Sequence, residues 1–389
     1  MDRLLRSLII RANKLDKLHN TALPLNATNK RNKSVSVAFL SPYPLGGAPS
    51  QRFRYEQYLP CLTQRGISYA IYPFLDHRTY RILYSPGHTL QKVVGLLSGF
   101  LRRIIHVVYS CRATYVFIHR EAAPVGPPGI EWFLAKVARR KIIYDFDDAI
   151  WLTDPSHVNP VAAFVKWPRK VAVICQWSHT VSAGNAYLAD FARHRASRVI
   201  INPTTIDTVY YHNRLQEQAT RPPVVGWTGS HSTLKYLDLL VPVLQQLQKK
   251  YDFQFLVIAD RPPVLALTSL AFVRWQQETE IDDLLRIHVG LMPLPDDAWA
   301  KGKCGFKALQ YLALGIPALV SPVGVNTQIV EHNIEGYHCT TEEDWYRALE
   351  ELLTSPEKRS SMGQAGRKKV VNHYSVEANT KNFLSLFGP

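Results

Sequence analysis

The chain is poor in the residue patterns that build metal centres and disulfide frameworks. Its five cysteines are scattered, odd in number and without a C-x-x-C pair: Cys61, Cys111, Cys175, Cys304 and Cys339. Such a set argues against a zinc site or a disulfide scaffold and favours a reducing, cytoplasmic location. The fourteen histidines include no H-E-x-x-H pattern. We therefore expect neither a bound metal nor a cofactor.

Long uninterrupted apolar runs are also absent. No stretch reaches about eighteen consecutive apolar residues, so we expect no transmembrane helix. The N-terminal segment 1–33 opens with MDRLLRSLIIRANKLDKLHN, which is too often interrupted by charge for a secretion signal. It reads as an amphipathic basic helix, for which packing on the protein and a role at an anionic membrane surface both stay open. A second such stretch, LQKVVGLLSGFLRRIIHVV at 90–108, is expected to pack on the protein.

Acidic residues are clearly outnumbered. The chain has 46 Lys and Arg against 31 Asp and Glu, a net charge of +15. This favours acidic partners such as nucleotide-sugars or anionic lipid headgroups. No aromatic–basic run of the kind found in RNA-binding modules occurs, so nucleic acid is not an expected partner. With 389 residues, 46% of them hydrophobic, the chain can build two domains with substantial cores.

Strand-like and helix-like segments alternate along the chain, which is typical of parallel sheets covered by helices. Strands are expected at 35–41, 67–74, 114–119, 141–146, 224–230, 253–260, 287–295 and 318–320. A helix is expected at about 232–250, after the strand that opens the second half. The polar segment 210–223 reads as a linker. We therefore predict an α/β protein with domains at 34–209 and 210–373, followed by a last amphipathic helix within 374–389.

The most informative stretch is KGKCGFKALQYLALGIPALVSPVG, residues 301–324. Gly302 and Gly305 allow a tight loop before a helix, and a glycine and a proline end that helix before a buried strand. Three polar side chains share one helix face by their spacing: Lys303, Lys307 and Gln310. A glycine loop, a helix N-terminus and two lysines together suit an anion such as phosphate. A solvated basic face is the competing interpretation.

This stretch resembles the donor-binding part of retaining GT-B glycosyltransferases, the large group 1 or family 4. Those enzymes carry a helix ending like E-A-M-A-x-G-x-P-V-V-A-S, followed by a glycine turn. The chain has Q-Y-L-A-L-G-I-P-A-L-V-S at 310–321 and then Gly324. The resemblance covers nearly everything beyond about residue 34 and is strongest over 224–340. It implies two Rossmann-like domains facing across a cleft, with the C-terminal helix crossing back to the first domain.

The family's pair of glutamates is not kept in this chain. Gly302 stands at the first position and Gln310 at the second. In the family the second glutamate binds the nucleotide ribose and the first lies near the donor sugar. Gln310 can still bond a hydroxyl as a neutral amide. Two carboxylates just before the glycine loop, Asp296 and Asp297, offer a replacement for the first.

A second donor-binding signal is GWTGSHSTLKYL at 226–237. In the family a glycine, an arginine and a lysine six residues after the glycine hold the donor pyrophosphate. Gly229 and Lys235 match this spacing, while Ser230 takes the arginine position. Lysine charge here would stabilise the leaving diphosphate, although an ordinary exposed lysine is the competing interpretation. The predicted donor site therefore comprises Gly229, Lys235, Lys303, Lys307, Gln310 and Gly324.

An acidic cluster follows an apolar strand in YDFDDAIW, residues 144–151. Like charges this close raise the pKa of at least one carboxyl and can mark an acid/base site. The family often has a His-Asp pair here, and this chain has Asp147 and Asp148. We assign Asp147 to orient the acceptor hydroxyl or donor sugar, and Trp151 to stack on a sugar; Asp148 as a helix cap is the alternative. Asp-x-Asp is also the metal motif of the GT-A glycosyltransferase fold. That fold has a single domain and lacks the pattern of the second half, so a metal site here is the less favoured alternative.

Two further strand ends complete the predicted cleft. Gly46 and Gly47, after the first strand, allow close backbone approach. Arg52 is assigned to phosphate or acceptor, with a plain loop residue as the alternative. His119 ends the strand at 114–119 and is assigned as a base or sugar contact, with a structural histidine as the alternative. The predicted catalytic set is Asp147, Asp148 and His119, and the predicted acceptor side is Gly46, Gly47, Arg52 and Trp151.

The resemblance implies a metal-independent, hexosyltransferase-like retaining enzyme. It would move a sugar from a nucleotide-diphosphate sugar to a glycan or lipid-linked acceptor in cell-surface polysaccharide synthesis. The expected location is cytoplasmic, with peripheral attachment to the inner membrane face left open. The missing glutamates support a second hypothesis, a degenerate GT-B protein that binds a nucleotide-sugar or a partner without catalysis. A nucleotide-sugar epimerase of the same fold is a third, but its acidic pattern is not recognisable.

Overall fold

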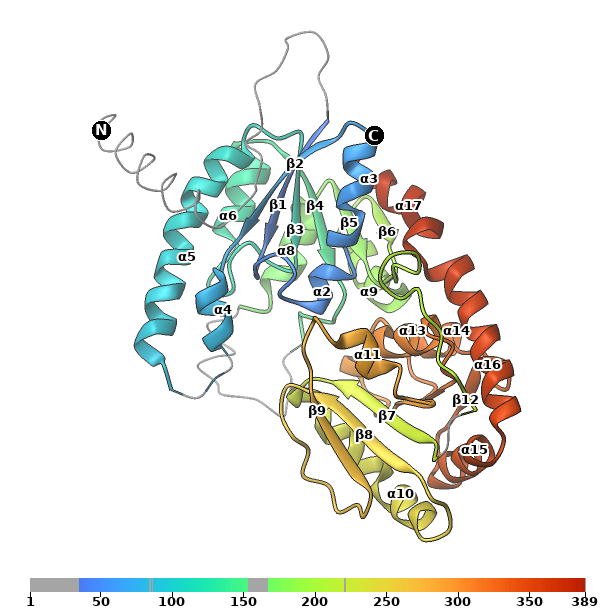
Figure 1. The fold of residues 1–389 in the computed structure, drawn as a ribbon. Helices are drawn as coiled ribbons and strands as arrows, with labels where there is room; N and C mark the ends of the chain where they lie inside the picture. The colour runs from blue at the N-terminus through green and yellow to red at the C-terminus, as the bar shows by residue number, and fades with distance from the viewer. Residues whose placement is uncertain (1–34, 84, 86, 153–166, 220–221, 389) are drawn as a thin grey trace.

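The computed structural model describes residues 35–83, 85, 87–152, 167–219 and 222–388, which form two α/β domains (Figure 1). The predicted amphipathic segment 1–33 lies outside these residues. Each domain is built on a six-stranded sheet, in the orders β2-β1-β3-β4-β5-β6 and β12-β11-β10-β7-β8-β9. Every strand pair within these sheets is parallel, so the predicted architecture of two parallel sheets is confirmed.

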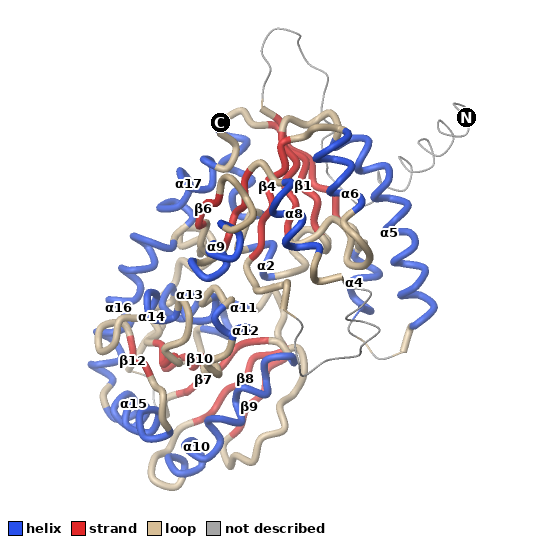
Figure 2. The backbone as a smooth tube through the Cα atoms, turned by 180° about the vertical axis from the view of Figure 1, so that it is seen from behind, coloured by secondary structure: helices blue, strands red, loops and turns tan. Residues whose placement is uncertain are grey.

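The inner strands of the first sheet are short and buried on both faces, as expected of parallel strands covered by helices, while the two edge strands are partly exposed. The strands of this sheet are β1 (Ser36–Ser41), β2 (Ser68–Pro73), β3 (Tyr115–His119), β4 (Lys141–Phe146), β5 (Thr180–Ala183) and β6 (Val199–Ile201). Helical segments cover the sheet on both sides (Figures 1 and 2). They are α2 (Pro49–Arg52), η1 (Glu56–Tyr58), α3 (Leu59–Gln64), α4 (His77–Leu83), α5 (Thr89–Ser110), α6 (Gly129–Trp132), the π-helical turn η2 (Phe133–Val137), α8 (Lys170–Trp177) and α9 (Ala186–Arg193).

The second sheet has the same construction. Its strands are β7 (Val224–Gly229), β8 (Gln254–Ala259), β9 (Leu270–Arg274), β10 (Val289–Met292), β11 (Ala318–Val320) and β12 (Gly336–His338). Its helices are η4 (His231–Leu240), α10 (Val241–Gln248), α11 (Glu280–Leu284), α12 (Ala298–Lys301), α13 (Phe306–Ala313), α14 (Asn326–Ile329), α15 (Glu342–Thr354) and α16 (Pro356–Lys369). The single helix predicted over 232–250 is two helices, a 3₁₀ segment followed by α10. Pro242, at the start of α10, lacks the N–H that would continue one α-helix across the junction.

The C-terminal helix returns to the first domain, as predicted. After α16 and the π-helical turn η5 (Val370–Tyr374), α17 (Val376–Ser385) begins at Ser375, whose side chain caps it. Phe383 stacks on Tyr58 with ring centroids 4.3 Å apart. Val376, Phe383, Leu386 and Phe387 share one buried cluster with Val37, Phe39 and Tyr55 of the first domain. Helix α17 therefore contributes directly to the first domain's core.

Helix α5 only partly fulfils the prediction that residues 90–108 pack on the protein. One side is buried, with Gly95 and Gly99 set closely against Thr79 and Phe74. The opposite side is exposed, and α5 lies at the flank of the molecule away from α16 and α17 (Figure 1). By length and composition alone, α5 also qualifies as a membrane-spanning helix among the described residues, a feature that the search for uninterrupted apolar runs does not detect.

Candidate functional site

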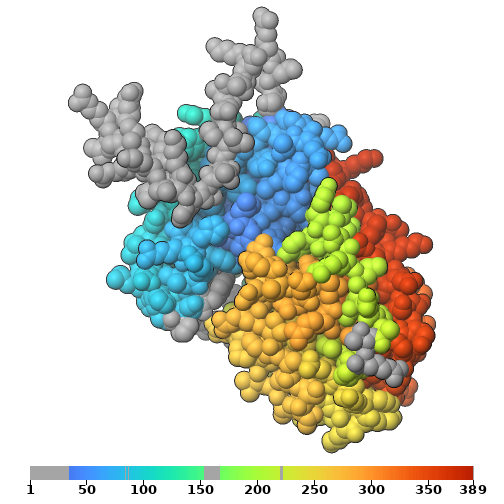
Figure 3. Space-filling view, viewed as in Figure 1, coloured from blue at the N-terminus to red at the C-terminus, as the bar shows by residue number. Residues whose placement is uncertain are grey.

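The carboxyl ends of β3, β4 and β5 face the loop that precedes α13 in the other domain. The space-filling view shows the two domains in contact with each other (Figure 3). Ligands of open parallel sheets bind at such strand ends. The side chains predicted from the sequence are therefore largely brought to one region, although several have protein partners that the sequence did not reveal.

Beneath this region lies a buried polar network centred on Asp145. The fully buried Arg54 donates to both Asp145 carboxylate oxygens and to the Ser182 hydroxyl. Ser182 donates to Asp145 at 2.6 Å, and the His119 Nδ1 lies 2.8 Å from Asp145 Oδ2. Burial would raise the pKa of Asp145, but Arg54 and His119 outweigh it and hold the pKa well below its usual range. Asp145 is thus a fixed anion that orients His119.

His119 is completely buried, and its second ring nitrogen points toward the glycine loop. Nε2 lies 3.4 Å from the hydroxyl of Ser50, at the start of α2. In the structure His119 therefore has the surroundings of a structural histidine, which was the alternative interpretation. Its partner is the Asp145 carboxylate. In this arrangement His119 has no exposed surface through which a ligand could reach Nε2.

Asp147 and Asp148 lie just above this network and are joined by Arg120. The Arg120 guanidinium contacts Asp147 Oδ1 and Asp148 Oδ2, each at 2.7 Å. Arg120 has φ +60°, a strained conformation for a side-chain-bearing residue, held by its N–H bond to the carbonyl of Asp145 at 2.7 Å. The residue after β3 is therefore fixed so that its cation reaches both carboxylates.

The prediction that crowding raises a carboxyl pKa in this cluster is wrong for Asp148. Burial acts in that direction, but Lys303 and Arg120 outweigh it, and the pKa of Asp148 is lowered. Lys303 Nζ lies 2.9 Å from Asp148 Oδ1. Burial would lower the pKa of Lys303, yet Asp148 raises it. Two residues assigned to different parts of the site therefore form one ion pair between the domains.

The loop 301–305 docks closely on the first domain. Asn185 donates from Nδ2 toward three successive carbonyls, those of residues 301, 302 and 303, at 3.3, 3.2 and 2.9 Å. The Cys304 thiol lies 3.1 Å from the carbonyl of Asp147. A Cβ on Gly302 would lie 2.7 Å from that of Ala149. The position of the family's first glutamate therefore has no room for a side chain in this arrangement.

Lys307 is the predicted donor residue best placed to receive an anion. It lies in the first turn of α13, and its ammonium is 5.3 Å from the centre of the Trp227 ring. No carboxylate is recorded as its partner among the described residues. Burial, followed by repulsion from Lys303, lowers the pKa of Lys307 to about 8. A phosphate would relieve both effects, because it supplies the missing opposite charge.

Gln310 is buried and bonded to another side chain. Its Nε2 donates to Glu280 Oε1 at 3.3 Å. Glu280 Oε2 accepts from Arg52 at 2.7 Å and from the Tyr211 hydroxyl at 3.1 Å, and Oε1 accepts from Trp275 at 3.2 Å. Arg52, predicted to face phosphate or acceptor, is thus the cation of a second ion pair between the domains.

The other predicted donor positions have distinct surroundings. Gly229 ends β7, where a Cβ would lie 2.4 Å from the Trp227 ring, next to Lys307. Lys235 is exposed on η4, with its ammonium 5.4 Å from the centre of the Tyr236 ring. Gly324 has φ +57°, and a Cβ there would lie 3.0 Å from the Lys301 carbonyl. Gly324 therefore permits the close turn beneath the docking loop.

The replacement carboxylates proposed for the missing glutamate are engaged elsewhere. Asp297 caps α12 by accepting the N–H of Ala300 at 2.7 Å. Asp296 is exposed and pairs with Lys301 at 3.0 Å. In this arrangement neither of the two takes the place of the missing side chain.

The acceptor-side residues also have partners. The N–H of Gly46 (φ +75°) donates to Glu56 at 2.9 Å, and Gly47 packs closely against Tyr80. The ring of Trp151 stacks face to face on Phe191 at 3.7 Å, which covers one face of the indole. Tyr187 and Phe146 also lie against this ring, so the predicted sugar contact competes with aromatic packing.

Sequence reasoning missed the parts that Asn185, Glu280 and Arg120 play in the site. Asn185 follows a strand and precedes a helix, so an N-cap was readable from the sequence, but its second role toward residues 301–303 was not. Glu280 carries no local signal, because its partners come from four separate segments. Among the described residues, no group of three or more His, Cys, Asp or Glu is placed to hold a metal ion.

Two α/β domains joined by a returning C-terminal helix define the GT-B class of glycosyltransferase folds, and three solved structures of about the same length share it. Sucrose-phosphate synthase from Thermosynechococcus elongatus has a TM-score of 0.62 at 13% identity, covering 91% of this chain and 98% of the other. A glycosyltransferase from Rickettsia africae gives 0.63 at 12%, covering 92% and 98%. Anabaena HepE, in complex with UDP and glucose, gives 0.59 at 12%, covering 90% and 98%.

The second domain also carries a sequence match. Residues 213–369 match the family model of glycosyl transferases group 1, which agrees with the resemblance to group 1 enzymes noted in this part of the sequence. No curated protein sequence matches the chain. The matched segment contains Lys235, Lys303, Lys307 and Gln310, and it joins the first domain at the acidic cluster.

Proposed function

We propose that the protein is a retaining glycosyltransferase that transfers a sugar from a nucleotide-diphosphate sugar. The observation that carries this proposal is Lys307, a half-buried cation at the N-terminus of α13 with no carboxylate partner among the described residues. It lies within the segment that matches group 1 glycosyltransferases. A diphosphate bound there would meet both the ammonium and the free N–H groups of the helix.

The chemistry requires positive charge near the leaving group. As the glycosidic bond breaks, the nucleoside diphosphate gains negative charge, and fixed cations stabilise it. Lys307 would provide this charge, with Lys235 as a second, exposed contribution and Gly229 allowing close approach. In this proposal the lysines take the part that a metal ion plays in other transferases. Because HepE is described with UDP and with UDP-glucose, UDP is the first nucleotide to test.

On the acceptor side, the proposal assigns Asp147 to orient the acceptor hydroxyl or the donor sugar. Its side chain is 12% exposed beside Arg120. His119 ends β3 at the same edge of the sheet, and its hydrogen bond to Asp145 fixes the orientation of its ring. The Lys303–Asp148 pair would have to separate to admit both substrates between the domains. The acceptor in this proposal is a glycan or lipid-linked sugar of cell-surface polysaccharide, and the enzyme acts in the cytoplasm.

The test is calorimetric titration of UDP, with other nucleoside diphosphates in parallel. Lys307→Ala should weaken binding about tenfold or more, since a charge-assisted contact to phosphate is lost. Lys249→Ala, an exposed lysine that ends α10, is the matched control and should bind like the wild type. Equal affinity in all three proteins would contradict the donor-site assignment.

A degenerate, non-catalytic binder is the second candidate. It is favoured by Gly302, where no carboxylate fits, and by Gln310, whose amide is engaged with Glu280. A sugar-transfer assay with a panel of nucleotide-sugars separates the two candidates. Nucleotide binding without transfer from any donor to any acceptor tested would favour the binder.

A further inference from the structure

Helix α5 presents a continuous apolar stripe to the outside of the first domain. Its buried positions, Gly95, Gly99, Arg103 and His106, lie on one side. Seven apolar side chains on the other side are each at least 46% exposed: Leu90, Val93, Val94, Leu97, Leu101, Ile104 and Val108. A helix on the surface of a soluble domain normally buries its apolar face. An exposed stripe of this length marks an interaction surface.

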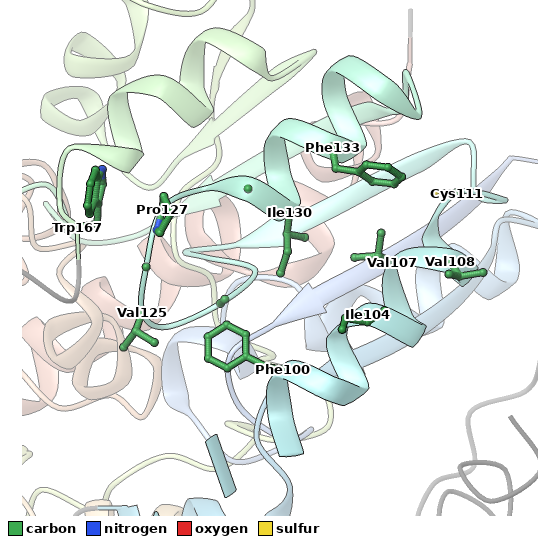
Figure 4. A pocket seen from close by; sticks show the side chains of 13 residues that line it. Phe100, Ile104, Val107, Val108, Cys111, Val125, Pro127, Ile130, Phe133 and Trp167 are labelled. Carbon is green, nitrogen blue, oxygen red and sulfur yellow. The ribbon is translucent and has the colours of Figure 1, made fainter. Parts of the chain in front are cut away.

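The stripe borders an apolar groove of about 960 Å³. One wall is α5, through Phe100, Ile104 and Val107, and the other is formed by Ile130 and Phe133 (Figure 4). Trp167 lies at one end, close to Pro127 and Val125 in the same view. No charged side chain lines the groove among the described residues. Its lining therefore suits a hydrocarbon chain.

The elements around the stripe carry positive charge. Residues 77–120 contain no aspartate or glutamate. Exposed basic side chains lie on the flanking segments: Arg78 and Arg81 on α4, Arg112 directly after α5, and Lys136 and Arg139 in and after η2. An apolar helix face bordered by cations complements the acyl region and the anionic headgroups of a lipid bilayer. Two copies of the chain meeting on this face would instead bring like charges together.

The groove also leads toward the candidate site. Its wall includes Ala123 and Val125, in the loop that leaves β3. The same loop begins at Arg120, whose guanidinium joins Asp147 and Asp148. A chain held in the groove would therefore lie beside the segment that shapes the cleft.

We propose that α5 and this groove form a docking surface for an anionic lipid bilayer. The apolar stripe lies in the interfacial region, the basic flanks contact the headgroups, and one acyl chain of a bilayer lipid enters the groove. Docking of this kind requires no sugar transfer, so its test is independent of the proposed activity.

The first experiment is co-sedimentation of the full chain with vesicles. Wild type should bind phosphatidylcholine–phosphatidylglycerol vesicles and bind pure phosphatidylcholine vesicles weakly. The double variant Leu97→Glu, Leu101→Glu should bind these vesicles with an affinity at least about tenfold lower, because two side chains that would enter the interface become charged. Both positions are 59% or more exposed, so folding should be retained. Val264→Glu, at a second-domain residue that is 98% exposed, is the matched control and should bind like the wild type.

The second experiment reports on the groove itself. Phosphatidylglycerol with brominated acyl chains should quench tryptophan fluorescence, and Trp167→Phe should reduce that quenching while vesicle binding persists. Undiminished quenching in Trp167→Phe would remove the groove from the proposal, and unchanged binding of the double variant would overturn it. A wild-type dimer that the double variant dissociates, with no vesicle binding, would assign the surface to a second copy. Vesicle binding lost only on changing Leu4 and Leu8 would assign membrane contact to the N-terminal segment.

Discussion

At the scale of single residues, Gly302 determines how closely the two domains approach. Its Cα faces Ala149 of the first domain so tightly that any Cβ would lie within 2.7 Å of the Ala149 methyl group. Gly184 has a matching role on the other side, where a Cβ would lie 2.4 Å from the Cys304 sulfur. The absence of a side chain at residue 302, where the resembling family has its first glutamate, therefore permits the close contact between the domains that is seen here. Replacing Gly302 by glutamate alone would overpack this contact between the domains.

Lys307 gives a pH-dependent prediction. With its pKa lowered to about 8, the ammonium loses its proton as the pH rises through that value. A diphosphate favours the charged form, so binding should take up protons near pH 8, and affinity should fall between about pH 7 and pH 9. The phosphate's own titration, near pH 6, lies below this window. Calorimetry at both pH values, in buffers of different ionisation enthalpy, measures the affinity and the proton uptake.

Lys307→Arg provides the control for that measurement. A guanidinium stays charged throughout this range, so its affinity profile should be flat between pH 7 and pH 9. Wild-type affinity that is equally flat would show that the diphosphate does not contact Lys307.

Asp147→Asn tests whether the acidic cluster takes part in catalysis. The amide keeps the shape and removes the charge, so folding and UDP affinity should persist while turnover falls about 10²-fold or more. Steady-state transfer kinetics beside UDP titration separate these effects. Transfer at the normal rate would make the cluster structural and return attention to His119.

Single positions were more predictable than their partners. Lys303 and Asp148 were each singled out by local patterns, a glycine loop before a helix and acids after a strand. Their ion pair joins positions 155 residues apart, and no local pattern reports such a contact. The lowered pKa of Asp148 follows from that pairing, so the sequence alone could not predict it either.

At the scale of elements, long apolar segments were predictable and short ones were not. Eight of the strands matched apolar runs that stand out between polar breaks. The strands β5, β6, β9 and β12 were not among those predicted. β5 reads T-V-S-A and β12 reads G-Y-H, too few apolar residues to indicate a strand. In the sheets, these strands are held by the neighbours they pair with rather than by their own composition.

Asn185 serves two elements at once, which gives a prediction at this scale. Its Oδ1 caps α9 by accepting the N–H of Leu188 at 2.9 Å, while Nδ2 faces the three carbonyls of the docking loop. Asn185→Asp should keep the cap and lose the donor, placing a carboxylate against carbonyl oxygens. We expect it to lower the free energy of unfolding by about 1–3 kcal/mol, measured by denaturant titration.

A helix cap whose second contact is local and exposed is the comparison, since the Ser355 hydroxyl also donates to Glu357 at 3.4 Å. Ser355 caps α16 by accepting the N–H of Lys358 at 3.2 Å, and Ser355→Asp should stay within about 0.5 kcal/mol of the wild type. If Asn185→Asp behaves the same way, the contact to the docking loop contributes no stability.

At the scale of the whole molecule, two ion pairs among the described residues help to join the domains. One is Lys303–Asp148, at the acidic cluster, and the other is Arg52–Glu280. Both lie where the proposed function requires substrates to enter. A transferase built this way would open before binding and close again around the donor. The ion pairs would then set the balance between the two arrangements.

The Arg52–Glu280 pair allows a test of that balance. Arg52→Gln and Glu280→Gln should each lower stability by about 3 kcal/mol, because a largely buried charge loses its partner. If the two side chains act as a pair, the double variant should lose about 1–3 kcal/mol less stability than the sum of the two single losses. Denaturant titration of the four proteins gives the coupling, and small-angle scattering follows the opening. Strictly additive losses would show that the contact does not hold the domains.

The returning helix α17 has a consequence for how the chain is made. The first domain begins at the first strand, yet Val376, Phe383, Leu386 and Phe387 belong to its buried cluster. On the ribosome, residues 35–201 emerge first and must wait, with that part of the core uncovered, until the whole second domain has been synthesised. The last pieces of this core become available only after residues 376–387 have left the ribosome. A ribosome stalled before residue 376 would therefore hold a first domain whose apolar surface is open to chaperones, however completely the second domain had folded.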